Sequence, residues 1–502
     1  MNSARQPATP FTEIELKLAL PTMDSHALAQ RLGRLPMLAR RKASLERLQN
    51  TYYDTPDDAL NSQRTALRIR RVESQNHPVW LQTLKMGGNR DSALSQRGEW
   101  ESTVRGANLE FDKLQATPWL QMDPDGALIR SLVARFTTDF TRTRWTVRNR
   151  DGCIVEVAFD LGQIAVGEHS AAICELELEL KAGQPAALFD IARQIASVVA
   201  VVPLGASKAQ RGFALAQSTL GQPLRARPPV LTPDMSVPQA ATATLREAFN
   251  HFNGNLYTLL TSDDPEVVHQ ARVGWRRLKT SLVLFKKTSL VQSAPPLHAL
   301  KPLLKELGRL RDLEVANLQT LPMLANAYVG GSPKRQAHWQ ALQGALAQAA
   351  ADRHQSVRHA LHNPATGASL LALTEWLESK HNVETPRANS AGERAALRPW
   401  ALQRLERLRA QLKATLKKSP KPDNLHRARI LAKRQRYGVE TLGALLPKRR
   451  AQQWYRQATR LQSSIGADRD LRQALHMAKR LGAHSKLLQF LQTVSLGRKH
   501  PR

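Results

Sequence analysis

The sequence predicts an α+β protein of at least two domains, a β-rich part followed by an all-α part. Three observations predict this. The 502 residues exceed the usual size of a single domain. Short alternating runs occupy residues 1–218, whereas long helical periodicity occupies residues 238–502. Of the net charge of +31, residues 1–220 carry +3 and residues 221–502 carry +28, which indicates two parts with different partners.

The first part is expected to consist mainly of strands. Turn residues separate seven runs in which apolar and polar residues alternate: Phe11–Leu18, Ala66–Val72, Val79–Lys85, Arg97–Val104, Thr141–Val147, Cys153–Asp160 and Ile173–Lys181. So many short strands over some 200 residues favour a barrel or a sandwich. Helices are predicted near residues 24–33 and 184–199.

The charged residues of these strands lie on shared faces. Glu13, Glu15 and Lys17 face one side of their strand, because side chains alternate along it. Glu175 and Glu177 repeat this arrangement. One such face is usually solvated, but like charges two residues apart repel each other. A closed barrel whose charged side chains surround a polar interior explains seven such strands better. Such an interior suits a multivalent anion together with Mg²⁺ or Mn²⁺, which prefer hard oxygen ligands.

These motifs resemble a known family over residues 10–218. Glu13-x-Glu15-x-Lys17 is similar to the ExExK signature of the CYTH (triphosphate tunnel metalloenzyme) superfamily. The rest of its pattern follows in order: Tyr52–Pro56, Ala66–Arg70, the Lys85 strand, Arg97 with Glu99, Arg142–Trp145, Glu156–Asp160, Glu175 with Glu177 and Glu179, and Ser207–Gly212. The resemblance implies an eight-stranded antiparallel tunnel that binds a triphosphate and Mg²⁺ or Mn²⁺.

The resemblance also implies roles for individual residues. The implied phosphate-binding residues are Lys17, Arg68, Arg70, Lys85, Arg97, Arg142, Arg144 and Lys208. The implied metal ligands or water-orienting groups are Glu13, Glu15, Asp160, Glu175 and Glu177, and the implied catalytic residues are Glu13, Glu15, Lys17 and Lys85. Looser candidates are Glu99, Glu101 and Glu179, whereas Tyr52, Tyr53 and Trp145 are expected to pack in the core.

The helical part contains an internal duplication. The segment from His269 to Lys279 aligns with the segment from His426 to Arg436. About forty residues after each comes Gly-x-x-Arg-Asp, and the two copies are Gly308/Arg311/Asp312 and Gly466/Arg469/Asp470. Two ordered matches at similar spacing predict two related helical bundles. A row of cations on one helix face is self-repelling, which favours an anion-binding groove over a solvated face.

The duplicated His-x-x-Arg pattern resembles the CHAD domain (conserved histidine α-helical domain) over about residues 238–502. That resemblance implies a pair of four-helix bundles that bind inorganic polyphosphate. The implied binding residues are His269, Arg272, Arg276, Arg277, Lys279, His426, Arg429, Lys433, Arg434 and Arg436, with Arg311 and Arg469 as further candidates. Nucleic acid is a rival ligand, because it too is a phosphate chain, although an aromatic stacking platform is missing.

The combination of the two parts resembles bacterial inorganic triphosphatases. It therefore favours inorganic triphosphate as the substrate in the barrel. Three alternatives stay open: a polyphosphate-binding protein with a weak or inactive barrel, an adenylate cyclase, and a thiamine triphosphatase. The cyclase would release pyrophosphate and a cyclic nucleotide instead of orthophosphate.

The remaining features concern the linker between the two parts and the cellular compartment of the protein. Residues 219–237 are rich in proline and are expected to form a linker. No run of eighteen apolar residues occurs and the start has no apolar signal region, so we expect neither a membrane span nor secretion. The only cysteines, Cys153 and Cys174, fit the reducing conditions of a cytoplasmic protein and are expected to be buried hydrophobic residues.

Overall fold

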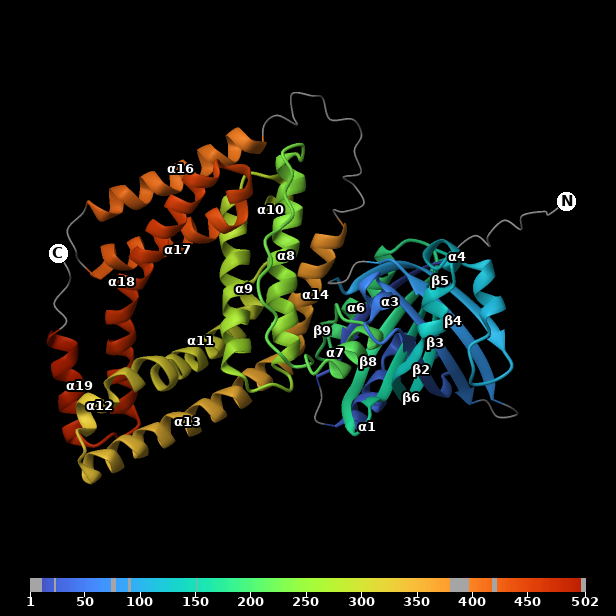
Figure 1. Ribbon diagram of the computed structural model, residues 1–502, viewed down its shortest axis with the longest axis horizontal. Coiled ribbons are helices and arrows are strands. Elements are labelled where there is room, and N and C mark those ends of the chain that lie inside the picture. Colours follow the sequence, from blue (N-terminus) through green and yellow to red (C-terminus); the bar gives the residue numbers. More distant parts are fainter. Residues whose placement is uncertain are drawn as a thin grey trace. The chain divides into compact units, whose positions relative to one another are not determined.

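The computed structural model describes residues 11–21, 24–73, 78–88, 92–149, 151–379, 397–417 and 422–497. The chain divides into two compact units. One contains residues 1–222 with residues 361–378, and the other contains residues 223–360 with residues 379–502 (Figure 1). Residues 361–378 belong to the first unit, whereas the sequence predicts one continuous helical domain from residue 238. The predicted boundaries themselves stay predictions.

The first unit is built on a closed antiparallel barrel. Its eight strands are β1 (Phe11–Ala19), β2 (Ser44–Asp54), β3 (Thr65–Glu73), β4 (Val79–Met86), β5 (Leu94–Val104), β6 (Val133–Arg148), β7 (Ile154–Val166) and β8 (His169–Ala182). They are ordered β5-β4-β3-β2-β6-β7-β8-β1, and a further β1–β5 pairing closes the ring. The two-residue strand β9 (Val202–Pro203) adds to β1. The predicted eight-stranded barrel is confirmed.

Short helices cover the barrel and its ends. They are α1 (Ser25–Gly33), α2 (Pro36–Ala39), α3 (Ala59–Ser62), η1 (Phe111–Ala116), α4 (Trp119–Met122), α5 (Ala127–Ser131), α6 (Ala186–Ala196), α7 (Lys208–Ala216) and α14 (Pro364–Ser379). Apolar residues of the strands pack outward against these helices. For example, Leu16 of β1 and Leu178 of β8 share a core with Leu188 and Ile191 of α6. Because neighbouring strand residues face opposite sides, the charged residues between these leucines point into the barrel.

The second unit is mostly helical in its described residues. Its longer helices are α8 (Val237–Thr258), α9 (Pro265–Leu284), α11 (Lys301–Val315), α13 (Pro333–Leu361), α16 (Leu397–Leu416), α17 (Pro422–Leu442), α18 (Lys448–Arg480) and α19 (Ser485–Gly497). Shorter ones are α10 (Ser289–Gln292), η2 (His298–Leu300), η3 (Ala316–Thr320), η4 (Pro322–Leu324), α12 (Ala325–Val329) and η5 (Gly443–Leu445). The predicted helical character is confirmed, and the division into two duplicated four-helix bundles stays a prediction.

Local sequence explains where the main helices begin. Ser236 and Gln239 form a capping box at the start of α8. Asp264 caps α9 and is followed by Pro265, which suits the first helical position because its missing N–H would have no partner there. No helix within the described ranges is long and apolar enough to cross a membrane. Cys153 and Cys174 are both free thiols.

Candidate active site

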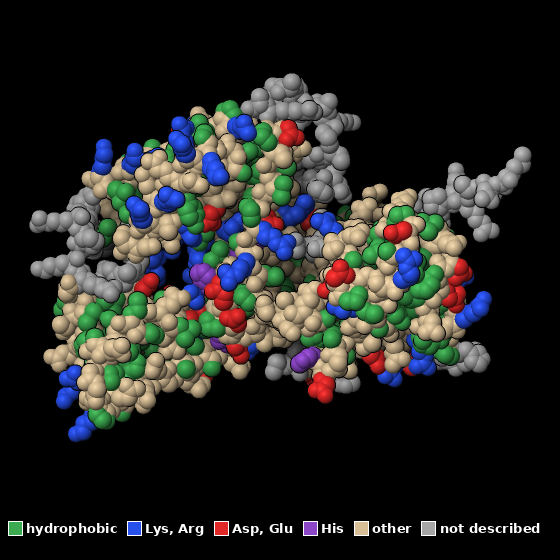
Figure 2. Space-filling view, viewed as in Figure 1, with side chains coloured by type: hydrophobic (Ala, Val, Ile, Leu, Met, Phe, Trp, Pro, Cys, Tyr) green, Lys and Arg blue, Asp and Glu red, His purple; other side chains and the backbone are tan. Residues whose placement is uncertain are grey.

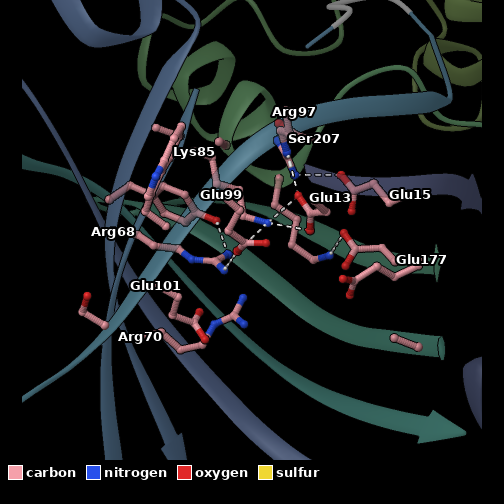
Figure 3. Close-up of a pocket in the computed structure, with 18 of the residues that line it drawn as sticks. Glu13, Glu15, Arg68, Arg70, Lys85, Arg97, Glu99, Glu101, Glu177 and Ser207 are labelled. Atoms are coloured by element: carbon pink, nitrogen blue, oxygen red, sulfur yellow. Dashed lines mark hydrogen bonds and ion pairs between the residues drawn. The ribbon is translucent and has the colours of Figure 1, made fainter. Parts of the chain in front are cut away.

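The barrel encloses a cavity of about 560 Å³ lined mostly by charged and polar side chains. Figure 3 shows Arg68 and Arg70 on one side of it and Glu13, Glu15 and Glu177 on the other. Thirteen residues singled out from the sequence line it: Glu13, Glu15, Arg68, Arg70, Lys85, Arg97, Glu99, Glu101, Arg142, Arg144, Glu177, Glu179 and Lys208. The barrel therefore brings together predicted side chains from six strands, β1, β3, β4, β5, β6 and β8, and from α7.

The first acidic group in this cavity belongs to β1. Arg97 of β5 bridges its two carboxylates, with Nε 2.9 Å from Glu13 and Nη2 2.7 Å from Glu15. Lys17 is 2% exposed and donates to Glu15 at 3.0 Å and to Ser95 at 3.2 Å. The Lys17 side chain borders a smaller cavity of about 60 Å³, whose lining shares Lys85 and Arg97 with the main cavity.

Charge pairing keeps these carboxylates ionised. Burial alone would raise the pKa of Glu13, but Lys85 and Arg97 outweigh burial and hold that pKa below its ordinary value. At Glu15, burial is likewise outweighed by Lys17 and Arg97, so its pKa is also lowered. Both groups are therefore acceptors at neutral pH, able to bind a cation or to orient a water molecule.

A second set of contacts continues around the barrel. Lys85 of β4 joins Glu13, at 2.7 Å, to Glu99 of β5, at 3.0 Å. Arg68 of β3 lies 3.9 Å from Glu99 and donates to the hydroxyl of Tyr52 at 3.4 Å. The cations from three neighbouring strands thus alternate with carboxylates. This gives a surface that can exchange internal ion pairs for contacts to phosphate oxygens.

Arg70 differs from the other cations of the cavity. Among the described residues it makes no ion pair, and its Nε donates to the neutral side chain of Asn50 at 2.8 Å. Burial, followed by repulsion from Arg68 and Arg142, lowers the pKa of Arg70 to about 10. A half-buried guanidinium that has no ion-pair partner and faces a cavity is well suited to bind an anion.

Three carboxylates converge at the β7–β8 side of the barrel. Lys208 of α7 lies between them, with its Nζ 2.6 Å from Asp160, 2.6 Å from Glu175 and 2.8 Å from Glu177. Arg142 of β6 adds a two-point contact to Asp160, with both distances 2.7 Å, and also pairs with Glu177. Burial opposes the charge of Lys208, but the three carboxylates outweigh it and raise the pKa of Lys208.

This group could hold a metal ion. Each of the three carboxylates offers an oxygen within 4.8 Å of the others, and no other such group of three is found in the described part of the chain. An all-oxygen set of acidic side chains suits Mg²⁺ or Mn²⁺. Of the five predicted ligands, Asp160, Glu175 and Glu177 belong to this group, whereas Glu13 and Glu15 lie outside it.

One residue that contacts these carboxylates was not predicted from the sequence to be a site residue. Arg211 is buried on α7, one turn after Lys208, and its guanidinium pairs with Glu175. The spacing Lys208-x-x-Arg211 at a capped helix start was the available signal, because residues three apart share a helix face. Ser95, which donates to Glu15 at 3.1 Å, was missed as well.

The last predicted barrel residues lie nearer to solvent. Arg144 is partly exposed and pairs with Glu46 at 2.7 Å and with Glu156 at 3.6 Å. Burial raises the pKa of Glu179, and Glu156 adds to this effect, although Lys181 at 2.5 Å opposes it. The residues expected to pack do so, since Tyr52, Tyr53 and Trp145 each belong to or border an apolar cluster.

In the helical unit the two duplicated motifs converge on one basic cluster, which we define as Arg272 and Arg276 of α9, Arg311 of α11, Arg429 and Lys433 of α17, and Arg469 of α18. Figure 2 shows Lys and Arg side chains with a histidine around a hollow of this unit. Gly308 lies beside the cluster, since a Cβ there would lie 3.3 Å from the guanidinium of Arg272. Arg276 reaches the second copy, where it donates to Tyr437 at 2.9 Å.

The cluster carries more positive charge than its acids balance. Arg469 lies 4.0 Å from Asp312, but Arg272, Arg429 and Lys433 make no ion pair among the described residues. Burial and repulsion from Arg429 and the neighbouring arginines lower the pKa of Lys433 to about 7. The buried Nε of Arg272 has no acceptor among the described residues. These features favour an anionic ligand at the cluster.

The other predicted helical residues lie in different settings. His269 is half-buried, and burial together with Arg311 lowers its pKa to about 4, whereas His426 is exposed. Arg277 is buried and donates to the carbonyl of Arg227 at 2.7 Å. Arg277 and its counterpart Arg434 lie about 80° around their helices from the histidines, away from the row. Lys279 is exposed, and Arg436 stacks on Tyr437 at 4.5 Å.

Two known protein families match the chain, one in each half of the sequence. Residues 12–213 match the CYTH domain, and residues 243–479 match the CHAD domain. The chain carries a CYTH domain followed by a CHAD domain. The barrel with its charged cavity lies within the CYTH match, and both duplicated motifs lie within the CHAD match.

A curated relative matches the CYTH part. The chain is 35% identical over 213 residues to an inorganic triphosphatase of Haemophilus influenzae. The matched stretch covers 40% of this chain. The chain spans about half (54%) of the length of that relative.

Two solved structures are similar to parts of the chain. A CHAD domain from the plant Ricinus communis is 24% identical, with a TM-score of 0.45, over 55% of this chain and 91% of that one. A putative adenylyl cyclase from Hippeastrum, described as having a dominant triphosphatase activity, is 20% identical, with a TM-score of 0.29, over 41% of this chain and 95% of that one.

Proposed function

We propose that the CYTH domain hydrolyses inorganic triphosphate to pyrophosphate and orthophosphate with Mg²⁺ or Mn²⁺. The observation that carries this proposal is a cavity lined by several cations and by Glu177, which forms a three-carboxylate group with the buried Asp160 and Glu175 behind it. A site that only binds phosphate gains nothing from Asp160, Glu175 and Glu177, because their charge repels the ligand. A site that also binds a divalent cation needs such oxygens. The H. influenzae relative supports the choice of substrate.

The cations are proposed to bind the phosphate chain. Arg70 has no carboxylate partner among the described residues, so it can bind phosphate without breaking an ion pair. The other binders are Lys17, Arg68, Lys85, Arg97, Arg142, Arg144 and Lys208, whose ion pairs would be exchanged for phosphate contacts. Charge-assisted contacts of this kind stabilise charge that develops on the transferring phosphoryl group.

The carboxylates are proposed to hold the metal and to orient water. Asp160, Glu175 and Glu177 would ligate Mg²⁺ or Mn²⁺, which supplies charge neutralisation at the phosphate oxygens when bound. Glu15, whose pKa is lowered, accepts a hydrogen bond from the attacking water. The water oxygen bonds to the terminal phosphorus, and the bond from that phosphorus to the bridging oxygen breaks. Pyrophosphate leaves with the electron pair, and the water proton passes to a carboxylate or to solvent.

Product analysis tests this assignment. Purified protein should release orthophosphate from inorganic triphosphate faster than from ATP or thiamine triphosphate. Preference for thiamine triphosphate would reassign the substrate, and cyclic nucleotide with pyrophosphate from ATP would indicate a cyclase. Glu15→Gln should abolish release while the thermal unfolding midpoint stays near that of the wild type. Full activity of this folded variant would exclude the proposed role of Glu15.

We further propose that the CHAD domain binds inorganic polyphosphate at the basic cluster. The unbalanced charge of Arg272, Arg429 and Lys433, drawn from both copies of the motif, favours a linear polyanion over a single phosphate. Fluorescence anisotropy with labelled polyphosphate tests this, with unlabelled RNA as competitor. Displacement by RNA at equal phosphate concentration would make nucleic acid the better candidate.

A further inference from the structure

Helix α14 belongs to the barrel unit although it lies more than a hundred residues beyond the barrel in sequence. Leu371 is fully buried in the same apolar cluster as Leu16 of β1 and Leu178 of β8, and Ala368 packs against that cluster. The CYTH match ends at residue 213, so it does not include this helix. The apolar core beside β1 is therefore completed by a segment outside that match.

The first turns of α14 touch the segment that leads into β9. A Cβ at Gly367 would lie 2.6 Å from the carbonyl oxygen of Val201 and 2.8 Å from its nitrogen, so only glycine allows this approach. Three residues after Val201, the N–H of Leu204 donates to the carbonyl of Lys17 at 2.9 Å. The start of α14 thus contacts the chain three residues before one backbone partner of Lys17.

The last turn of α14 touches the other flank of β1. Ser92 donates to the carboxylate of Glu378 at 2.8 Å, and both side chains are buried. Ser92 also accepts from the N–H of Leu94 at 3.2 Å, which fixes the entry into β5. The carbonyl between them, on Ala93, accepts from the N–H of Lys17 at 2.9 Å.

The helix therefore contacts both segments that hydrogen-bond to the backbone of Lys17. Ser95 follows Ser92 by three residues, and its hydroxyl contacts Glu15 and Lys17. Arg97 follows Ser92 by five residues and pairs with Glu15. We infer that α14 is a positioning element of the barrel site and that Glu378 is a positioning residue for Glu15 and Lys17, acting through Ser92. For its effect on hydrolysis, this inference rests on the proposed function.

A neighbouring ion pair provides the matched control. Glu375, one turn before Glu378 on the same helix, pairs with Arg193 of α6 at 2.5 Å. Its side chain and that of Arg193 are partly exposed, and such pairs contribute little. Glu375→Ala therefore removes a carboxylate from α14 without touching the entry into β5.

Hydrogen exchange in the full-length protein tests the positioning directly, without any activity. Glu378→Ala and Ser92→Ala should each speed amide exchange in residues 93–97 and at Lys17 by about tenfold or more. In residues 93–97 the double variant should exchange no faster than Ser92→Ala, because Glu378 acts on this segment through Ser92 and that contact is already lost in Ser92→Ala. Glu375→Ala should match the wild type. Equal exchange in Glu378→Ala and the wild type would overturn the inference.

Kinetics separates positioning from simple packing. Glu378→Ala should lower kcat for inorganic triphosphate about tenfold while the barrel unit stays folded at the assay temperature, because Glu15 loses its fixed orientation. Glu378→Gln keeps an acceptor oxygen for Ser92 and should recover most of the rate, and it serves as the test variant if the alanine variant does not fold. Wild-type kcat in both variants would overturn the inference. Absence of hydrolysis in the wild type would refute the proposed function while the exchange result still stands.

Discussion

The ammonium group of Lys208 lies 2.6 Å from the carboxylate of Asp160, inside the one group of acidic side chains that could hold a metal in the described part of the chain. A lysine on a helix start thus neutralises the place where a divalent cation would bind. Metal and Lys208 cannot both stay between these carboxylates. We therefore expect Lys208 to move to a phosphate oxygen of the substrate when metal binds.

Replacing Lys208 by methionine separates these two roles. Without the ammonium group the three carboxylates repel one another, so they should bind Mn²⁺ at least as tightly as in the wild type. Triphosphate loses a charge-assisted contact, and KM should rise roughly tenfold to a hundredfold. Calorimetric titration with Mn²⁺ and steady-state kinetics measure both. Loss of Mn²⁺ binding with an unchanged KM would contradict this account of Lys208.

Arg70→Met should stabilise the protein and weaken substrate binding. Removing a half-buried guanidinium that is repelled by Arg68 and Arg142 relieves this repulsion, so the unfolding midpoint should rise by about 2–4 °C. KM for triphosphate should rise at least about tenfold. Arg71→Met is the control, because Arg71 lies on the other face of β3 and pairs with Glu73 near the surface. Equal KM values for both variants would argue against Arg70 as a phosphate ligand.

Much of the barrel site could be predicted from alternation alone. The strand pleat fixes which side chains share a face, so Glu13, Glu15 and Lys17 could be assigned to the interior before the strand pairing was known. Strand β2 was not among the predicted runs, because some of its apolar residues are exposed and some of its polar residues are buried. Leu45 is 71% exposed there, whereas Asn50 is buried. The eighth strand came from the family resemblance.

The lysine of the basic cluster should make polyphosphate binding proton-linked. The pKa of Lys433 is about 7 in the folded protein and about 10.4 when unfolded, so between these values the unfolded chain binds more protons. Stability of the CHAD domain should therefore rise with pH over this window. A bound polyanion raises the pKa again, so binding at pH 8 should take up protons.

Calorimetry in two buffers of different ionisation enthalpy measures this uptake. Lys433→Met should take up fewer protons than the wild type and bind polyphosphate more weakly, while its unfolding midpoint at pH 7 should rise because one repelled charge is gone. Lys413→Met, at an exposed position of α16, is the control. Identical proton uptake in the two variants would show that Lys433 does not contact the ligand.

Other features could not be predicted, because they depend on contacts between distant segments. Arg277 belongs to the repeated motif, yet the structure uses it to hold the carbonyl of Arg227. Leu371 is buried in the same core as Leu16 and Leu178, which lie hundreds of positions away in the sequence. The apolar residues around Leu371 predict a helix but not the partner that this helix packs against. Periodicity tells which face of an element is apolar, but not which partner covers that face.

The central claim is metal-dependent hydrolysis of inorganic triphosphate in the barrel, and orthophosphate release measures it most directly. The full-length protein should release one orthophosphate per triphosphate with Mg²⁺ or Mn²⁺ and none with EDTA, and Glu177→Gln should reduce the metal-dependent rate at least about a hundredfold. Release that persists in EDTA, or its absence with either metal, would contradict the account.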